Sequence, residues 1–323
     1  MIGTSIPIVA FFFLSHRLRL PMQPTTRRDF LRNTALTVSG SLLAARTAWA
    51  IPAIGRTRPS HLKLSLAAYS YRQLLQGNEP KMDLFDFVNL AADQGLDGVE
   101  LTSYYFPADV TTEYLHRIKQ HAFVLGLDIS GTSVGNNFCV PDGPARDKQM
   151  ELVRTWVDRA AELDAPVIRI FAGTVAKGDD EAKAVERAID GIKASLPYAA
   201  ERGVSLALEN HGGITATPGQ LLKLVKAVDA PNFGVNLDTG NFHGEDPYAD
   251  LAELAPYAVN VQVKTEISRK GQKKEEADLA KVIDILRTAR YSGYVVLEYE
   301  AAEDPMKAVP RHIKTLRNLI DAR

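Results

Sequence analysis

Four apolar segments in the second half of the chain each carry a polar side chain at or near their carboxyl end. These side chains are Glu209, Asp238, Gln262 and Glu298. Successive side chains of a strand point to opposite faces, so in the segment SLALE the bulky Leu206 and Leu208 face one side and Glu209 faces the other. The other three segments alternate in the same way. If the four are neighbouring strands of one barrel, we expect these polar side chains to meet inside its mouth.

Three carboxylates that meet in a partly dry space repel one another, and burial disfavours their charged forms unless a cation compensates. The carboxylates and the side-chain carbonyl of Gln262 are hard oxygen donors, which favour Mg²⁺ or Mn²⁺ as the cation. The alternative is that each acid pairs with a basic residue of the barrel, such as Lys264 or Arg169. Acids whose pKa values are shifted by their surroundings cluster at functional sites, so we favour a metal site.

From Leu62 onward, short apolar segments alternate with longer amphipathic ones, which is the pattern of a parallel sheet wrapped by helices. The predicted strands are 62–68, 98–102, 128–132, 167–172, 205–209, 233–238, 259–263 and 293–299. The predicted helices between and after them are 83–94, 112–125, 147–163, 180–202, 218–228, 277–290 and 305–319, with a short one near 248–254. Eight such units in about 260 residues match the usual size of a (β/α)8 barrel. We therefore predict an α/β fold, a single-domain (β/α)8 TIM barrel over residues 51–323. No glycine-rich phosphate turn follows the first strand, which disfavours a doubly wound sheet.

The composition is that of an ordinary globular protein. The 323 residues are 46% hydrophobic and 24% charged, with a formal net charge of -1. A net charge this close to zero does not indicate the basic surface that binds nucleic acid. The single cysteine, Cys139, excludes an internal disulfide framework and a multi-cysteine metal cluster. The composition leaves the oligomeric state open, a homo-oligomer included.

Residues 1–50 are predicted to be an N-terminal extension with an export signal. The segment resembles a twin-arginine signal peptide: Arg27 and Arg28 form the pair, a short apolar run follows at 34–45, and the small-x-small ending AWA closes at Ala50. The apolar run is shorter than the roughly 20 residues that span a bilayer. We therefore expect recognition by the export machinery, cleavage after this ending, and a periplasmic or secreted protein.

Four motifs resemble the xylose isomerase-like TIM-barrel superfamily, which includes sugar phosphate isomerases and epimerases, ketose 3-epimerases and endonuclease IV. They are ENHGG at 209–213, NLDTGNF at 236–242, VQVK at 261–264 and GYVVLEYE at 293–300. The resemblance implies that a divalent metal is held by Glu209, Asp238, Gln262 and Glu298. It also implies that Glu209 and Glu298 move the proton in catalysis. Gln262 departs from this pattern, since many relatives have histidine at this position. A neutral amide oxygen is a poorer metal ligand than imidazole.

The resemblance implies a metal-dependent sugar isomerase or epimerase. A metal that binds two oxygens of a keto sugar stabilises the enediolate that forms when a base removes the α-proton. Two carboxylates on opposite sides of that carbon serve as base and acid. Phosphorylated sugars are mainly cytoplasmic, so the export signal favours a small non-phosphorylated carbohydrate as the substrate. Residues near the strand ends are candidates to bind it: Tyr69, Asn137, His211, His243, Lys264 and Glu300.

Other functions fit parts of the same pattern. A lyase or hydratase acting on 3-keto-glycosides uses the same enolate step and fits an exported location. A non-catalytic carbohydrate-binding barrel fits the loss of the histidine ligand at Gln262, and it predicts ligand binding that chelation and Glu209→Gln leave unchanged. An endonuclease IV-like phosphodiesterase is disfavoured, because the chain lacks the ligands of a histidine-rich zinc site. On the second and fourth strands, Glu100 and Arg169 are expected to form a structural ion pair inside the barrel.

Overall fold

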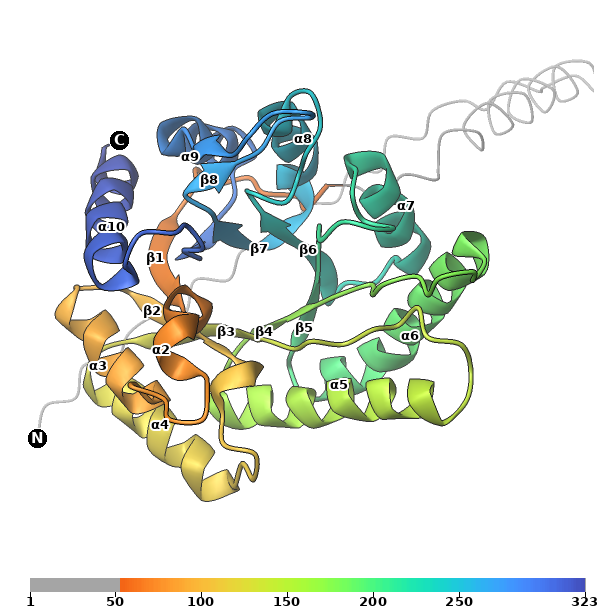
Figure 1. Cartoon of the computed structure of the whole chain (residues 1–323), viewed down its shortest axis with the longest axis horizontal. Helices are drawn as coiled ribbons and strands as arrows, with labels where there is room; N and C mark the ends of the chain where they lie inside the picture. The colour runs from red at the N-terminus through yellow and green to blue at the C-terminus, as the bar shows by residue number, and fades with distance from the viewer. Residues whose placement is uncertain (1–52, 323) are drawn as a thin grey trace, which may run out of the picture. The chain divides into compact units, whose positions relative to one another are not determined.

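The computed structural model describes residues 53–322, in which eight parallel strands close into a barrel that is surrounded by helices (Figure 1). The barrel strands are β1 Leu62–Ala67, β2 Gly98–Thr102, β3 Asp128–Ser133, β4 Val167–Ile170, β5 Ser205–Glu209, β6 Phe233–Asp238, β7 Ala258–Val263 and β10 Gly293–Leu297. They pair in the order β1-β10-β7-β6-β5-β4-β3-β2, and β2 pairs with β1 to close the ring. The predicted (β/α)8 TIM barrel is confirmed. The predicted export signal and the boundary after residue 50 lie outside the described residues.

The helices form the outer layer of the barrel. The longer ones are α3 Leu84–Asp93, α4 Thr112–Val124, α5 Pro144–Leu163, α6 Glu181–Glu201, α7 Pro218–Val228, α8 Pro247–Leu254, α9 Leu279–Thr288 and α10 Pro305–Asp321, and the short ones are η1 Ala68–Tyr71, α2 Arg72–Leu75, η2 Ser103–Tyr105 and η3 Ala255–Tyr257. Most of the longer helices begin after an Asp or Thr that accepts a backbone N–H, and Asp83 and Thr217 form full capping boxes. These caps fix where the helices start and so how long the loops at the mouth are. No helix in the described part of the chain is long and apolar enough to cross a membrane.

A small hairpin separates β7 from α9 and was not predicted from the sequence. It consists of β8 Glu266–Ile267 and β9 Glu275–Glu276, which pair antiparallel. Strands of two residues are too short to show a periodic pattern, which is why the sequence does not reveal them. Barrel strands β4 and β10 each end two residues earlier than predicted, at Ile170 and Leu297. Glu298 therefore follows its strand directly and lies at the mouth.

The register of neighbouring strands sets the height of each polar side chain in the barrel. Asp238 on β6 is level with Gln262 on β7, and Gln262 is level with Val296 on β10. Glu298 lies two residues beyond Val296, so it is level with Lys264, two residues beyond Gln262. A backbone hydrogen bond of 2.9 Å from Glu298 N to the carbonyl oxygen of Val263 fixes the alignment of Glu298 with the end of β7. The acid and the lysine are therefore placed side by side by strand register.

Candidate active site

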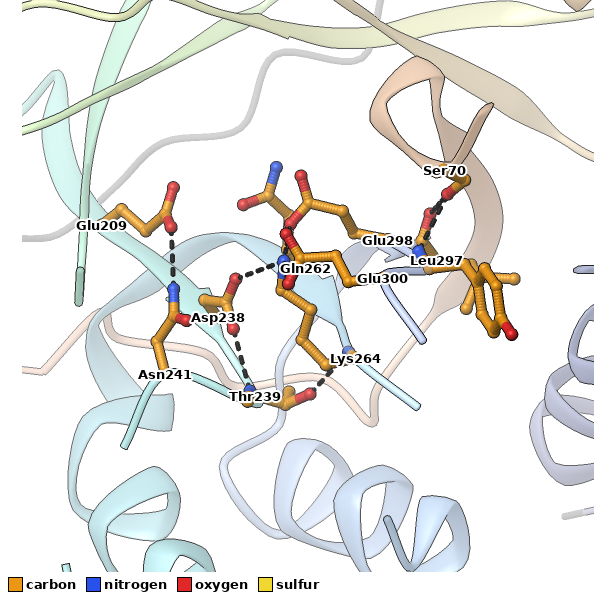
Figure 2. Close-up of polar contacts among 12 residues, drawn as sticks. Ser70, Glu209, Asp238, Thr239, Asn241, Gln262, Lys264, Leu297, Glu298 and Glu300 are labelled. Atoms are coloured by element: carbon orange, nitrogen blue, oxygen red, sulfur yellow. Dashed lines mark hydrogen bonds and ion pairs between the residues drawn. The ribbon is translucent and has the colours of Figure 1, made fainter. Parts of the chain in front are cut away.

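The carboxyl ends of β5, β6, β7 and β10 bring polar side chains together at the mouth of the barrel (Figure 2). The group comprises Glu209, Asp238, Gln262, Lys264, Glu298 and Glu300. The first five residues are each at most 6% exposed, whereas the side chain of Glu300 is 33% exposed. In Figure 2, Asp238 and Lys264 lie between Glu209 on one side and Glu298 on the other. The structure therefore gathers these acids on the interior side, at the face where barrel enzymes carry their chemistry.

Glu209 is held by a buried cation and an amide. Arg169 Nε on β4 lies 2.9 Å from Glu209 Oε2, and Asn241 Nδ2 donates to Glu209 Oε1 at 3.0 Å. Arg169 thus pairs with Glu209, and the expected ion pair between Arg169 and Glu100 was wrong. Burial raises the pKa of Glu209 well above its usual range, and the nearby Asp238 raises it further while Arg169 opposes the shift.

Asp238 is fixed through its backbone and through one oxygen, while its other oxygen lacks a hydrogen bond. Asn210 Oδ1 accepts from Asp238 N, and Asn210 Nδ2 donates to the Asp238 carbonyl oxygen, both at 2.9 Å. Gly240 N donates to Asp238 Oδ1 at 2.8 Å. Asp238 Oδ2 is buried and has no hydrogen-bond partner. Burial raises the pKa of Asp238 to about 7, against the lowering effect of Lys264.

Lys264 is the cation nearest to the acids of β6 and β10. Its Nζ lies 2.5 Å from Glu298 Oε2, 3.0 Å from Glu300 Oε2 and 3.4 Å from Asp238 Oδ2. Thr239 Oγ1 accepts from the backbone N of Lys264 at 2.9 Å, which fixes where the side chain starts. An ammonium shared by several carboxylates offsets much of their mutual repulsion. Lys264 and Arg169 are the two basic residues that the alternative weighed from the sequence named as partners of the acids.

Gln262 belongs to a closed hydrogen-bond network in the barrel interior. Its Nε2 donates to Glu100 Oε1 at 2.8 Å, and its Oε1 accepts from Asn236 Nδ2 at 2.7 Å. Asn260 Nδ2 completes the ring, because it donates to Asn236 Oδ1 at 2.9 Å and to Glu100 Oε2 at 3.0 Å. Burial raises the pKa of Glu100 to about 7. Both polar atoms of the Gln262 amide are therefore in use within the protein.

The donor set, as the structure places it, does not fit the predicted divalent ion. Within residues 53–322 no group of three or more His, Cys, Asp and Glu side chains converges closely enough to hold a metal. The Gln262 oxygen accepts from Asn236, and the ammonium of Lys264 lies among the carboxylates. The unpartnered Asp238 Oδ2 is a donor atom that such an ion would find open.

The predicted substrate-binding residues divide into two groups. Lys264, His243 and Glu300 line one cavity of about 130 Å³ together with Asn241, and the Tyr69 ring centroid lies 5.8 Å from Lys264 Nζ. The other two residues lie apart from this cavity. His211 packs on Phe171 with ring centroids 4.3 Å apart, and the side chain of Asn137 ties loops together by bonding to Thr174 and Cys139.

Sequence reasoning missed several residues that shape the site. Asn241 contacts Glu209 and lines the cavity, Asn236 bonds to Gln262, and Asn260 links Asn236 to Glu100. Interior parity turns Asn236 and Asn260 inward, since they alternate with bulky apolar residues on β6 and β7, but it does not identify the side chains to which they bond. Asn241 lies three residues after Asp238, in a loop where no periodic signal exists.

Gly240 leaves room for the Lys264 side chain, which allows a test of its position. An added Cβ at Gly240 would lie 2.6 Å from Lys264 Cγ and 2.7 Å from Lys264 Cβ. These atoms are close to the backbone and cannot swing away, so we expect Gly240→Ala to lower the free energy of unfolding by about 1 to 3 kcal/mol. Urea denaturation followed by circular dichroism measures the change.

Gly219 provides the matched control for this substitution. It lies in the first turn of α7, where an added Cβ meets nothing within 4 Å. Alanine is the better helix former, so Gly219→Ala is expected to leave stability unchanged or to raise it by up to about 1 kcal/mol. Equal stability losses in the two variants would contradict the close approach of Gly240 to Lys264.

Comparison with known proteins places the chain in a family. The family model described as "Xylose isomerase-like TIM barrel" matches residues 88–319. A curated relative, an uncharacterised protein from Methanocaldococcus jannaschii, is 22% identical over 177 residues, which are 50% of this chain and 60% of the relative. The chain therefore spans 60% of the length of the curated relative that it matches.

Solved structures share the fold at low sequence identity. A D-psicose 3-epimerase from Clostridium cellulolyticum H10, solved with D-tagatose, superposes with a TM-score of 0.63 at 18% identity and covers 80% of this chain and 92% of its own. A 3-keto-D-glucoside 4-epimerase from E. coli gives a TM-score of 0.63 at 16% identity over 80% of this chain and 99% of its own. At such identities the likeness shows the fold. The family match extends over most of the barrel, and the chain belongs to the xylose isomerase-like TIM barrel family.

Proposed function

We propose that the chain is a sugar isomerase or epimerase that moves a proton on a carbon next to a carbonyl group. The observation that carries the proposal is a pair of buried glutamates, Glu209 after β5 and Glu298 after β10, each beside its own buried cation. Arg169 Nε lies 2.9 Å from Glu209, and Lys264 Nζ lies 2.5 Å from Glu298. Because β6 and β7 separate these two strands in the barrel, the glutamates can approach one substrate from two sides.

The proposed reaction starts when one glutamate removes the α-proton as a base. The electron pair of the C–H bond then forms the C=C bond of an enolate. Return of a proton by the second glutamate to the opposite face gives the epimer. Return to the neighbouring carbon, with the proton of the α-hydroxyl group moving to the former carbonyl oxygen, gives the aldose or ketose isomer. Loss of a β-substituent from the same enolate gives the product of a lyase. The sugar epimerases among the solved structures support the first outcome.

The proposed substrate is a small carbohydrate without a phosphate group. The cavity beside Lys264 offers hydrogen-bonding groups from Asn241, His243 and Glu300, and Tyr69 offers an aromatic ring nearby. Carbohydrates present hydroxyl groups and apolar C–H faces that suit such a lining. We also propose that the N-terminal segment exports the protein, which keeps it from cytoplasmic sugar phosphates. N-terminal sequencing of protein recovered from the exported fraction tests the cleavage after Ala50, and retention of the segment would contradict it.

The dependence on Mg²⁺ or Mn²⁺ that the family resemblance implies is not part of the proposed function. No step of the proposed proton transfer uses such an ion, because the donor atoms as placed do not form a site for it. Homo-oligomer formation stays a prediction.

Hydrogen exchange tests the proposed function. In D₂O, the full-length protein is expected to introduce deuterium at the α-carbon of a free ketose or a 3-keto-glycoside, which NMR detects. Exchange with inversion supports an epimerase, whereas release of the aglycone identifies the lyase alternative. Binding of these carbohydrates without exchange in any of them would overturn the proposal and favour a non-catalytic barrel.

A further inference from the structure

Lys264 places a positive charge at the point where the acids of β6 and β10 come together. Its Nζ lies within 3.4 Å of carboxylate oxygens of Asp238, Glu298 and Glu300. The residue is 6% exposed, and its main chain is tied to Thr239. Three carboxylates this close attract the ammonium of Lys264 and offset the cost of burying its charge. The lysine is therefore a charged ammonium in the interior of the mouth.

The side chains around Lys264 are poorly arranged to bind a divalent ion. Gln262 turns its oxygen to Asn236 and its nitrogen to Glu100, so its amide is already engaged in the network of the barrel interior. A divalent ion between Asp238 and Glu298 would also approach the Lys264 ammonium, and two cations repel at that distance. The Lys264 ammonium already offsets part of the charge of these carboxylates.

Lys264 also has a way to reach a ligand. One N–H of Lys264 donates to Glu298 Oε2, and the ammonium also forms an ion pair with Glu300 at 3.0 Å. The contact with Asp238 is longer, and Asp238 Oδ2 accepts no hydrogen bond. A further N–H is therefore available to a carbonyl oxygen. The side chain borders the cavity that is also lined by Asn241 and His243.

We propose that Lys264 itself is the cation of this site, and that its ammonium binds the substrate carbonyl oxygen and stabilises the enolate without a divalent ion. The inference rests on the proposed sugar isomerase or epimerase function. It makes Lys264 a catalytic residue, with the role that a metal is implied to have in the family.

The electrons and the proton balance in this step. A glutamate takes the α-proton, the C–H electron pair becomes the C=C bond, and the π pair of the carbonyl moves onto its oxygen. The N–H of Lys264 hydrogen-bonds to that oxygen as its negative charge develops, and the lysine keeps its protons. Reprotonation at carbon reverses the electron flow. Nothing is oxidised or reduced, and no further reactant is needed.

Chelation of the wild-type protein is the first test. We expect full-length protein that has been treated with EDTA, and shown to be metal-free by mass spectrometry, to exchange deuterium into its substrate at the same rate as before. Added Mn²⁺ is expected neither to raise this rate nor to raise the melting temperature, because an ion that binds the folded state would stabilise it by mass action. Exchange that disappears on chelation and returns with Mn²⁺ would overturn the inference and leave the proposed function standing. Absence of exchange in every carbohydrate, with and without Mn²⁺, would overturn both.

Substitution of Lys264 is the second test. Lys264→Met is expected to lower the exchange rate by at least about 100-fold, the usual effect of removing one oxyanion donor, and Mn²⁺ is expected not to restore it. Lys264→Arg keeps the charge and is expected to retain more activity than the methionine variant. Lys270→Met is the matched control, because the side chain of Lys270 is 72% exposed and lies beside Glu245 on the surface; its rate should equal that of the wild type. Recovery of the Lys264→Met rate with Mn²⁺ would contradict the inference, and the Mn²⁺ melting test on the wild type decides the question if that variant does not fold.

Discussion

Glu298→Gln and Glu209→Gln are each expected to abolish interconversion of two epimers, with a rate at least about 100-fold and up to about 10,000-fold below that of the wild type. This is the usual contribution of a positioned acid or base. Glutamine keeps the shape of the side chain and removes its capacity to take the proton. Each variant should still exchange the α-proton of the epimer whose C–H bond faces the remaining glutamate. NMR in D₂O, started separately from each epimer, measures both quantities.

The control for these variants is Glu253→Gln, the same chemical change at an exposed position of α8. It should interconvert the epimers at the wild-type rate. If Glu209→Gln still interconverts them at that rate, the pair of glutamates is not the proton-transferring pair. If both variants exchange the same epimer, the two carboxylates do not act on opposite faces.

Arg169→Met is expected to lower the free energy of unfolding by about 3 to 5 kcal/mol. The side chains of Arg169 and Glu209 are each 5% exposed, so the substitution leaves a buried carboxylate without its cation, and this is the typical cost of breaking a buried ion pair on one side. The loss of Arg169 also frees the carbonyl oxygen of Val134, which accepts from Arg169 Nη1 at 2.8 Å. Urea unfolding at neutral pH measures the change.

A double-mutant cycle separates the ion pair from general packing. In the background of Glu209→Gln the carboxylate charge is already absent, so adding Arg169→Met should cost clearly less than it does in the wild type. Additive losses in the double variant would show that Arg169 and Glu209 are not coupled. Such a result would also remove the reason for assigning Glu209 a separate cation.

The strands of the barrel are largely predictable because their signal is local. The predicted ranges 205–209 and 233–238 coincide with β5 and β6, since alternation of bulky and small residues is visible within a few positions. The ends of β4 and β10 and the β8–β9 hairpin are not predictable in this way. Where a strand stops depends on whether a neighbouring strand still offers hydrogen-bond partners, and that is a property of the closed barrel.

The candidate active site was likewise predictable in part from the sequence. The order and parity of the strands determined, from the sequence alone, that Glu209, Asp238 and Glu298 face the interior at one end of a barrel. Only the tertiary structure decided which partners they meet there: Arg169 for Glu209, Lys264 for Asp238 and Glu298, and Glu100 with Asn236 for Gln262. The physical reason is that these partners lie up to 162 positions apart in the chain, and that burial makes each charge and amide take whichever partner the barrel brings within hydrogen-bond distance.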